Sequence, residues 1–387
     1  MQVDIAIVGG GVVGASLARA LAGSGLQIAL IEPRPARELP QAGFDTRVYA
    51  LSPRSLGFLE RCDVTRHLVA ERIAPISGMQ VRGDDGVAQI EFSAYRSHVL
   101  ELAAIIEESN LQQALDRTLV GQADLALLRG VGCEGAVWGR DAAALTLSDG
   151  TRVSARLVIA ADGADSRLRA AGGIEVRARA YQQKGVVASF EVGQPHRHIA
   201  HQWFRADGVL ALLPLPGDQV SMVWSAAEDK ADALLAMTAT GMADAVEAAA
   251  GGVLGPMTLS GKVAAFPLRR MRASRLIASR LALVGDAAHS VHPLAGQGLN
   301  LGLADAEALA GVLHDRGVET DCGATSLLRR YERGRKEDIL AMECVTDGLQ
   351  KLFASTLPGI PKLRNAGLGL ADRFSPLKRI LVKRALG

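Results

Sequence analysis

The stretch VDIAIVGGGVVGASLARALAGSGLQIALIE, residues 3–32, decides the fold of this chain. Residues 3–8 form an apolar run rich in branched side chains, which is typical of a buried parallel strand. A glycine-rich turn and a run of apolar residues at helical spacing follow, and a second apolar run ends in Glu32. A strand, a tight turn, a helix and a second strand in this order predict a βαβ unit, and therefore an α/β fold.

The glycines of the turn follow the pattern G-x-G-x-x-G, and each has a physical role. Gly9 permits the tight turn, Gly11 lets backbone N–H groups approach a pyrophosphate, and Gly14 lets the helix pack close to the strand. The positive end of the helix then stabilises the phosphate charge. Glu32 can accept hydrogen bonds from a ribose hydroxyl. We expect a bound dinucleotide, although this stretch alone does not separate FAD from NAD, and a tight turn without ligand is the alternative.

Two later segments repeat the strand-and-turn pattern. In RLVIAADGADSRLRAA (156–171), an apolar strand ends in Asp162-Gly163, and Ser166 is suited to cap the helix that follows. Alone, this is a common strand–turn–helix. In LALVGDAAHSVHPLAGQGLNLG (281–302), a strand ends in Gly285-Asp286, and a Gly-Gln-Gly loop leads into a helix start that offers backbone donors. A ligand that touches both this loop and the first one would be a dinucleotide carrying a flavin.

The three motifs, in this order and spacing, resemble those of the class A flavoprotein monooxygenases, single-chain aromatic hydroxylases that bind FAD. The resemblance implies a Rossmann-like FAD-binding domain of the para-hydroxybenzoate hydroxylase type. It also implies an inserted, mostly antiparallel β-sheet substrate domain and a C-terminal helical tail. In that family the aspartate equivalent to Asp286 contacts the ribityl chain, and the Pro-x-x-Gly-Gln-Gly loop lies along the isoalloxazine ring. The Asp-Gly motif is tied to both FAD and nicotinamide binding.

Further segments resemble the ubiquinone-biosynthesis hydroxylases in particular. They are DTRVYALSPRSLGFLERC (45–62), GVLALLPLPGDQVSMVW (208–224), HPLAGQGLNLGLADAEAL (292–309) and the C-terminal tail. In this subgroup Arg47 is expected to approach the flavin. A further FAD contact is placed on Gln113, in the segment IIEESNLQQAL (105–115).

The candidate site residues follow from the motifs and the resemblance. Pro293 and Gly296 are expected to lie beside the flavin C4a atom, and no acid or base residue is assigned. The expected cofactor-binding residues are Gly9, Gly11, Gly14, Glu32, Arg47, Gln113, Asp162, Gly163, Gly285, Asp286, Gly296, Gln297, Gly298 and Asn300.

The 387 residues are enough for two or three domains. We expect a discontinuous FAD-binding domain made of residues 1–75, 98–180 and 275–330. Segments 76–97 and 181–274 are rich in predicted strands and are expected to form the substrate sheet. Residues 331–387 are expected to form the C-terminal helical region.

The resemblance implies an FAD-dependent monooxygenase that hydroxylates the aromatic ring of a polyprenyl phenol or quinol intermediate in ubiquinone biosynthesis. NAD(P)H and O2 would be consumed through a flavin C4a-hydroperoxide. Since the cofactor carries the difficult chemistry, the protein must hold the ring and exclude water, which predicts a largely apolar pocket. The resemblance also implies that NAD(P)H visits the same active site, without a second Rossmann domain.

Three alternatives stay open. The same flavin chemistry could act on a small soluble aromatic acid, which needs cationic donors in the substrate sheet; Arg197 and Arg205 are nearby, but no clear set is visible. A flavin-dependent prenyl reductase would consume NAD(P)H without oxygen. A non-catalytic flavin-binding subunit of a biosynthetic complex would keep the motifs without turnover.

Two groups of histidines resemble metal ligands, but we expect no metal. His196, His198 and His201 would not share one face of a strand, and carboxylates are lacking nearby, so exposed histidines are the simpler interpretation. His289 and His292 sit beside Asp286 in the glycine loop, where a metal shell would be incomplete.

Charge and cysteine content bear on partners and location. The net charge of +2 gives no reason to expect nucleic acid. The four cysteines show no C-x-x-C pairing, so free thiols in the cytoplasm are expected. Residues 349–387 carry eight basic residues against one acidic residue, and Leu377, Ile380 and Leu381 have helical spacing. Two interpretations of this tail stay open. It lies on the inner face of an anionic membrane, where the enzyme would join a ubiquinone-biosynthesis complex, or it packs on the protein with its charges solvated.

Overall fold

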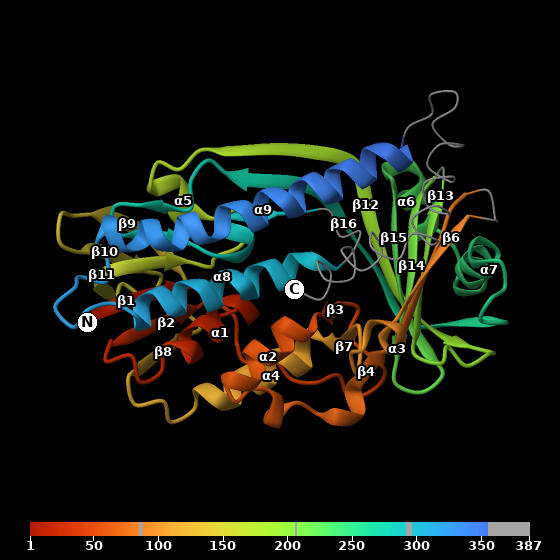
Figure 1. Ribbon diagram of the computed structural model, residues 1–387, viewed down its shortest axis with the longest axis horizontal. Coiled ribbons are helices and arrows are strands. Elements are labelled where there is room, and N and C mark those ends of the chain that lie inside the picture. The colour runs from red at the N-terminus through yellow and green to blue at the C-terminus, as the bar shows by residue number, and fades with distance from the viewer. Residues whose placement is uncertain (85–87, 206, 292–295, 355–387) are drawn as a thin grey trace.

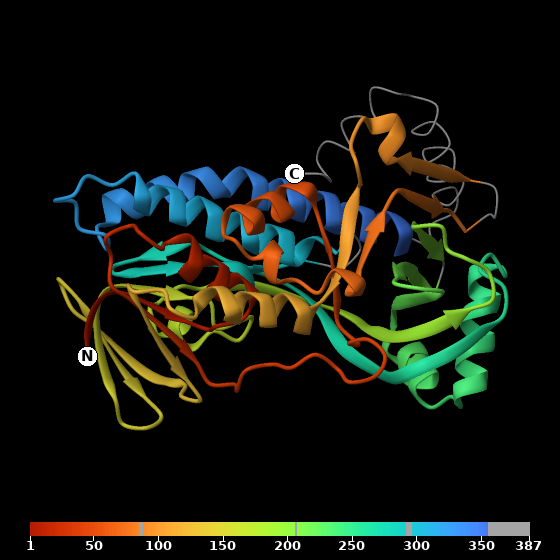
Figure 2. The ribbon, with the colours of Figure 1, turned by 90° about the horizontal axis from the view of Figure 1, so that it is seen from below.

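The computed structural model describes residues 1–84, 88–205, 207–291 and 296–354. Figure 1 shows two halves. One contains a largely parallel sheet with helices packed on it, and the other contains a strongly twisted antiparallel sheet. Two long strands, β12 (Val176–Val192) and β16 (Met257–Ala273), run from the first half into the second, as Figure 2 shows from another side.

The first sheet is built around the strand predicted at the N-terminus. β1 pairs in parallel with β2 and β11, β2 pairs in parallel with β8, and β11 pairs in parallel with β18. Every residue of β2 is buried, which agrees with its uninterrupted apolar sequence. The strands follow the order β17 (Ile277–Ala278), β18 (Leu281–Leu283), β11 (Arg152–Ala160), β1 (Gln2–Val8), β2 (Ile28–Glu32) and β8 (Leu125–Arg129), with β10 (Ala143–Leu147) and β9 (Cys133–Trp138) attached to β11.

Helices bury the faces of this sheet. α1 begins directly after the glycine turn and packs on both α8 and α4. The largest apolar core lies between these helices and the sheet, and Ile5, Ile7 and Leu17 in it are fully buried. The helices of this half are α1 (Val12–Ala20), α2 (Pro53–Arg61), α4 (Glu108–Leu119), α5 (Arg167–Ala171) and α8 (Gln297–His314), with short 3-10 turns at η1 (Thr65–His67), η2 (Ala70–Arg72) and η3 (Gly285–Ala287).

The second sheet contains the segments 76–97 and 181–274 that were expected to be rich in strands. All its described pairs are antiparallel except β13 with β5. Two helices within the second segment, α6 (Glu228–Leu235) and α7 (Ala239–Ala250), were not expected; they pack on one face of the sheet and bury a second core. The order is β19 (His289–Ser290), β16, β12, β15 (Gln219–Ala227), β14 (Gly208–Leu215), β13 (Ile199–Arg205), β5 (Gly78–Arg82) and β6 (Gln89–Ser93), followed along the chain by α3 (Ala94–Ser97).

A small third sheet lies between the two halves (Figure 1). Its order is β3 (Val48–Leu51), β7 (Ala103–Glu107) and β4 (Ile73–Ile76), and both pairs are antiparallel. Because β4 leads into β5 and β7 follows α3, this sheet carries the chain out to the second half and back.

The helical C-terminal region begins with α9 (Thr325–Ala354), which lies along α8 and then crosses the long strands (Figure 1). Arg270 and Arg272 of β16 form ion pairs with Asp347 and Glu343 of this helix. The basic tail after Ala354 lies outside the described residues. Within the described part, no helix combines the length and the apolar character needed to cross a bilayer.

Candidate functional site

The glycine turn between β1 and α1 is as tight as the sequence predicts. A Cβ at Gly14 would lie 1.9 Å from the Gly9 carbonyl oxygen, and a Cβ at Gly9 would lie 2.2 Å from the Ala161 carbonyl oxygen. Gly9 also has a φ of +107°, which side chains of L-residues rarely allow. Around Gly11 the nearest atom to an added Cβ is 3.6 Å away on Arg34, so this position opens into a cavity. Two glycines therefore close the turn and the third leaves room for a ligand.

Glu32 is buried at the end of β2 and holds this turn. Its Oε2 accepts a hydrogen bond from the Gly10 N–H at 2.7 Å, and its Oε1 accepts bonds from the Arg34 backbone N–H and Nε. Burial raises the pKa of this carboxyl, but the bonds from Arg34 and Gly10 outweigh burial, so the pKa lies below its ordinary value. The carboxylate is charged and well placed beside the loop, and its contact with a ribose stays a prediction.

The Asp162-Gly163 turn is joined to the third motif by Arg169. The Ser166 side chain caps α5 by accepting the Arg169 N–H, as predicted. The Arg169 guanidinium is buried and donates to the carbonyl oxygens of Ala287 and Ala164 at 2.9 Å. Asp162 Oδ1 is buried and has no hydrogen-bond partner among the described residues. This unpartnered carboxylate oxygen is available to a ligand beside the turn.

The Gly285-Asp286 turn rests on a buried network of charges that sequence reasoning missed. Asp305 of α8 is fully buried; its Oδ2 accepts the Gly285 N–H at 3.0 Å and lies 2.6 Å from His289 Nε2. Arg335 of α9 donates from Nε to the other oxygen of Asp305 at 2.8 Å. Burial lowers the pKa of His289, but Asp305 outweighs burial and raises it. His289 therefore has a structural partner that its position in the glycine loop did not reveal.

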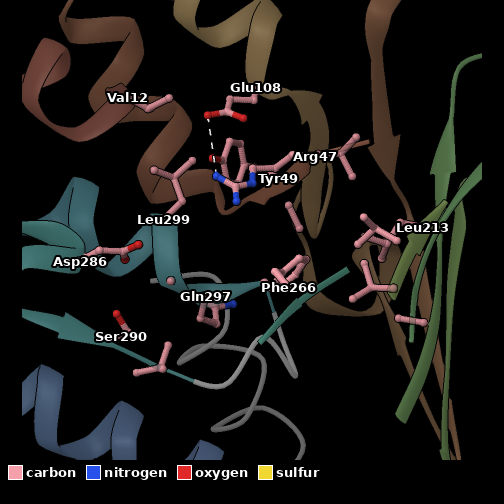
Figure 3. Close-up of a pocket in the computed structure, with 18 of the residues that line it drawn as sticks. Val12, Arg47, Tyr49, Glu108, Leu213, Phe266, Asp286, Ser290, Gln297 and Leu299 are labelled. Carbon is pink, nitrogen blue, oxygen red and sulfur yellow. Dashed lines mark ion pairs between the residues drawn. The ribbon is translucent and has the colours of Figure 1, made fainter. Parts of the chain in front are cut away.

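Asp286 itself points away from this network, toward the cavity. Its side chain is exposed there, and the surrounding protein still removes enough water to raise the pKa of the carboxyl, against the opposing effects of His289 and Arg47. Figure 3 shows Asp286 and Ser290 on the same side of the cavity. The geometry suits an acceptor for hydroxyl groups of a bound molecule.

The start of α8 also borders the cavity. Gly296 is its N-cap residue, with a φ of +61°, and an added Cβ at Gly298 would meet no atom within 4 Å. The Asn300 side chain accepts a hydrogen bond from the Ser52 N–H and donates one to the Ala50 carbonyl oxygen, and its contact with the cofactor stays a prediction. These bonds tie α8 to β3 and α2. Pro293 and His292 lie outside the described residues.

Arg47 lies in the cavity wall within a charged cluster that Figure 3 shows. Its Nη1 is 3.9 Å from Glu108 Oε1, and Glu108 also pairs with Arg37 at 2.8 Å. Burial, reinforced by Glu108, raises the pKa of the neighbouring Tyr49 to about 12, so this phenol remains protonated. The sequence resemblance pointed to Arg47, whereas Tyr49 and Glu108 carried no recognisable signal.

Both halves contribute to one cavity of about 860 Å³. The predicted residues Gly11, Gly14, Arg47, Gly163, Gly285, Asp286, Gly296, Gln297 and Gly298 line it, together with apolar residues of the second sheet. Gly9, Glu32, Gln113, Asp162 and Asn300 are not among its described lining residues. Near the first turn it is Gln112, the neighbour of Gln113, that reaches the Gly10 carbonyl oxygen at 2.8 Å.

The described residues fit FAD. The open positions at Gly11 and Gly298 provide two places where backbone can approach a ligand, and the Asp162 oxygen and the Asp286 carboxylate provide acceptors. All of them lie in or beside one elongated cavity, which matches a long dinucleotide rather than two separate ligands.

Comparison with known proteins identifies the family. The family model described as "FAD binding domain" matches residues 2–346. The chain is 35% identical to ubiquinone hydroxylase UbiL of Rhodospirillum rubrum, over 99% of this chain and 89% of that protein. This chain belongs to the ubiquinone-biosynthesis hydroxylase family of FAD-dependent monooxygenases. The hydroxylase is also 35% identical to 3-demethoxyubiquinol 3-hydroxylase of Escherichia coli, over 99% of this chain and 98% of that protein.

A solved structure confirms the fold of the hydroxylase. PqsL of P. aeruginosa, in complex with 2-aminobenzoylacetate, superimposes with a TM-score of 0.78 over 95% of this chain and 99% of that one, at 22% identity. The α/β architecture of the class A hydroxylases, predicted from the three motifs, is therefore confirmed.

The histidines in and just before β13 differ from the expectation in one respect. His196 and His201 are buried rather than exposed, and only His198 is exposed. His196 Nε2 lies within 3.0 Å of the carbonyl oxygens of Leu215 and Gly217, and positive φ angles at Arg197 and His198 make a turn where a strand was assumed. Among the described residues, no group of three or more His, Cys, Asp or Glu side chains is arranged to hold a metal.

Proposed function

We propose that this hydroxylase adds a hydroxyl group to the aromatic ring of a polyprenyl phenol or quinol, an intermediate of ubiquinone biosynthesis. The family supplies the reaction class, and the names of the relatives point to a ubiquinone precursor as substrate. The observation that carries the proposal is the single cavity, in which the FAD loops face an apolar wall from the second sheet. A ring bound against that wall would lie beside the flavin.

FAD would be held by the backbone of the first glycine turn, by Asp162-Gly163, by Gly285-Asp286 and by residues 296–298. When bound, it supplies the redox chemistry, taking electrons from NAD(P)H and activating O2. Asp286 would accept hydrogen bonds from the ribityl hydroxyls. Gly296 would lie near the reactive edge of the flavin, and Arg47 near its ring. NAD(P)H, the usual donor in this family, would enter the same cavity.

The remaining cavity residues position the substrate and exclude water. Phe266, Leu213 and Val223 present carbon atoms to the interior, so they favour an aromatic ring and disfavour water near the flavin. None of these three side chains is suited to act as a general acid or base. A ring that already bears oxygen substituents reacts readily once it is held correctly, so positioning is the main contribution of the protein.

We also propose which segments bind FAD and which bind the substrate. Residues 1–75, 98–180 and 275–330 would bind FAD, and residues 76–97 and 181–274 would bind the substrate. The basic tail would hold the enzyme at the inner face of an anionic membrane, where a polyprenyl substrate resides, and contact with other enzymes of the pathway would follow there. Deletion of residues 370–387 should weaken sedimentation with liposomes that contain anionic lipid; unchanged sedimentation would remove the membrane proposal.

The direct test of function is quinone profiling in a strain that lacks this enzyme. We expect a prenylated precursor with one ring hydroxyl fewer to accumulate, and complementation with the intact gene to restore the product. Purified protein should be yellow and release FAD on denaturation. Normal quinones in that strain, together with hydroxylation of a carboxylated aromatic by the purified enzyme, would favour a small soluble substrate.

A further inference from the structure

The wall of the cavity opposite the flavin loops contains a polar side chain that the fold does not use. We define this wall as the lining residues of three adjacent strands, β13, β14 and β15. They are Ala200, Gln202, Val209, Ala211, Leu213, Ser221, Val223 and Ser225. None of them is charged, and most are apolar. Gln202, Ser221 and Ser225 are the exceptions.

The alternation of side chains along a strand explains why Gln202 faces the cavity. Its neighbours His201 and Trp203 point to the opposite face, where their rings stack at 5.7 Å and Arg82 lies over the indole. Ala200 and Gln202 therefore share the inner face, and Gln202 stands directly opposite Ala211 of β14, which in turn stands opposite Val223 of β15. Ser221 and Ser225 lie two residues to either side of Val223.

The side-chain amide of Gln202 has no hydrogen-bond partner among the described residues, although the residue is only 4% exposed. The Ser221 and Ser225 hydroxyls, 1% and 4% exposed, also have no such partner. All three side chains line the cavity, so their polar groups are open to a bound molecule. The fold alone gives no reason for glutamine here, whereas a polar ligand does.

The distance across the row of Gln202, Ala211 and Val223 suits the width of a substituted ring. Two neighbouring strand spacings separate Gln202 from β15, roughly 10 Å. Ala211 lies between them, and its side chain is only a methyl group, so a flat ring can lie over it. An oxygen on one edge of that ring would reach the Gln202 amide, and an oxygen on the other edge would approach Ser221 or Ser225.

The charges around the cavity indicate that these ring oxygens are neutral. Three arginines are among the described lining residues, and each already faces a carboxylate. Arg34 pairs with Glu32 at 2.8 Å, Arg269 pairs with Asp165 at 2.8 Å, and Arg47 lies 3.9 Å from Glu108. A ring carboxylate against the wall would therefore lose its water without gaining a cation. A phenol, quinol or methoxy oxygen needs only the hydrogen bond that an amide provides.

We propose that Gln202 recognises a neutral oxygen substituent on the substrate ring, with Ser221 and Ser225 on the opposite edge, and that it selects neutral rings over carboxylated ones. This assignment rests on the proposed function, since it names the group that holds the ring of that substrate. It makes Gln202 a specificity-determining residue, and it accounts for a polar side chain in the cavity wall that the fold does not use.

The test uses the FAD-loaded enzyme and two probes that can be compared directly. One is a methoxyphenol that carries a short prenyl chain, and the other is the same ring with a carboxylate in place of the methoxy group. Binding is followed by the change in flavin absorbance, which needs no turnover. Gln202→Leu should weaken binding of the neutral probe by at least tenfold and leave the FAD dissociation constant unchanged. Gln89→Leu, which changes an exposed glutamine on β6 of the same sheet, should bind both probes as the wild type does.

Two further measurements test the role of Gln202. Because the Gln202 amide faces the cavity and bonds no other described residue, the FAD-loaded Gln202→Leu variant should melt close to the wild-type temperature when no probe is present, which shows that it folds. Gln202→Arg should improve binding of the carboxylated probe relative to the neutral one by at least tenfold. Unchanged binding of the neutral probe in Gln202→Leu would overturn the assignment, as would weakened FAD binding with unchanged probe binding.

Failure of the proposed function gives a different result. If the wild type binds neither prenylated probe and oxidises NAD(P)H without forming a hydroxylated product, the substrate class is wrong. If the wild type hydroxylates the neutral probe and Gln202→Leu does so with the same KM, only the assignment of Gln202 is wrong.

Discussion

Backbone groups form one side of the cavity, and side chains form the other. On the flavin side, backbone groups and glycines at the ends of parallel strands form the surface. Buried charged side chains behind it bond the backbone of the turns, namely Glu32, Arg169 and Asp305. On the substrate side, side chains from several antiparallel strands form the surface. The backbone groups of these strands are hydrogen-bonded within the sheet. The first side therefore tolerates few substitutions, whereas the second can change its ligand by exchanging single side chains.

The largest effect is expected where backbone meets backbone. Gly14→Ala should reduce FAD affinity at least 100-fold, about 3 kcal/mol, because the new Cβ would lie 1.9 Å from the Gly9 carbonyl oxygen and force the turn open. Equilibrium titration of the apoprotein with FAD measures this. Gly311→Ala, in α8 with nothing within 4 Å of the added Cβ, is the matched control and should bind FAD normally. Equal affinities in the two variants would contradict the close packing of α1 on β1.

The buried network behind the third turn should give the next largest effect. Because the pKa of His289 is raised in the folded protein, its stabilisation is fully present below the unfolded value of about 6.5 and is lost as pH rises through the folded pKa. The pKa of Asp305 is lowered, so its contribution is lost only in acid. His289→Gln should lower the free energy of unfolding by roughly 2 kcal/mol at pH 6, and by progressively less toward pH 9. Urea denaturation at fixed FAD concentration tests this.

The exposed His198 provides the control for that series. His198→Gln should change the free energy of unfolding little, and by a similar amount at each pH. A loss in His289→Gln that stays constant or grows from pH 6 to pH 9 would show that His289 is not held as an imidazolium by Asp305.

A smaller effect is expected from a single acceptor on the flavin side. Asp286→Ala should weaken FAD binding about tenfold, roughly 1.4 kcal/mol, because it removes the carboxylate that faces the cavity at the end of the third motif. The unfolding of the apoprotein should change little, since this side chain is exposed there. Retention of FAD through gel filtration, compared with the wild type, checks the prediction, and full retention would count against the assignment.

The smallest effect is expected on the substrate side. Ala211→Leu should raise the KM for a prenylated phenol about fivefold, roughly 1 kcal/mol, because the larger side chain would occupy the space where the ring is expected to lie. FAD affinity should not change. Ala178→Leu makes the same substitution at an exposed position of β12 and should leave the KM unaltered. A change in FAD affinity without a change in KM would reverse the proposed roles of the two sides.

The same contrast explains how much could be predicted from the sequence. Turns made by glycines at strand ends have a fixed spacing, so Gly9, Gly14 and Gly285 could be placed in the correct turns, and the fold followed from them. The helix cap at Ser166 was also readable because it depends on residues three apart.

Contacts between distant segments could not be read in this way. Arg335 reaches Asp305 only because α9 lies along α8, and Arg169 joins two motifs that are far apart in the chain. The hydrogen bonds of Asn300 to Ser52 and Ala50 likewise depend on the packing of α8. The place of Gln202 in the cavity wall depends on the strand register, which sets it opposite Ala211.

The central claim is that FAD and an oxygen-bearing neutral ring occupy one cavity and that the ring receives an oxygen atom from O2. The most direct measurement supplies purified enzyme with NAD(P)H, a short-chain prenylated phenol and oxygen-18 gas, followed by mass spectrometry of the product. We predict a hydroxylated ring that carries one oxygen-18 atom for each molecule formed. A product without the label, or NAD(P)H oxidation that yields no hydroxylated ring, would contradict the claim.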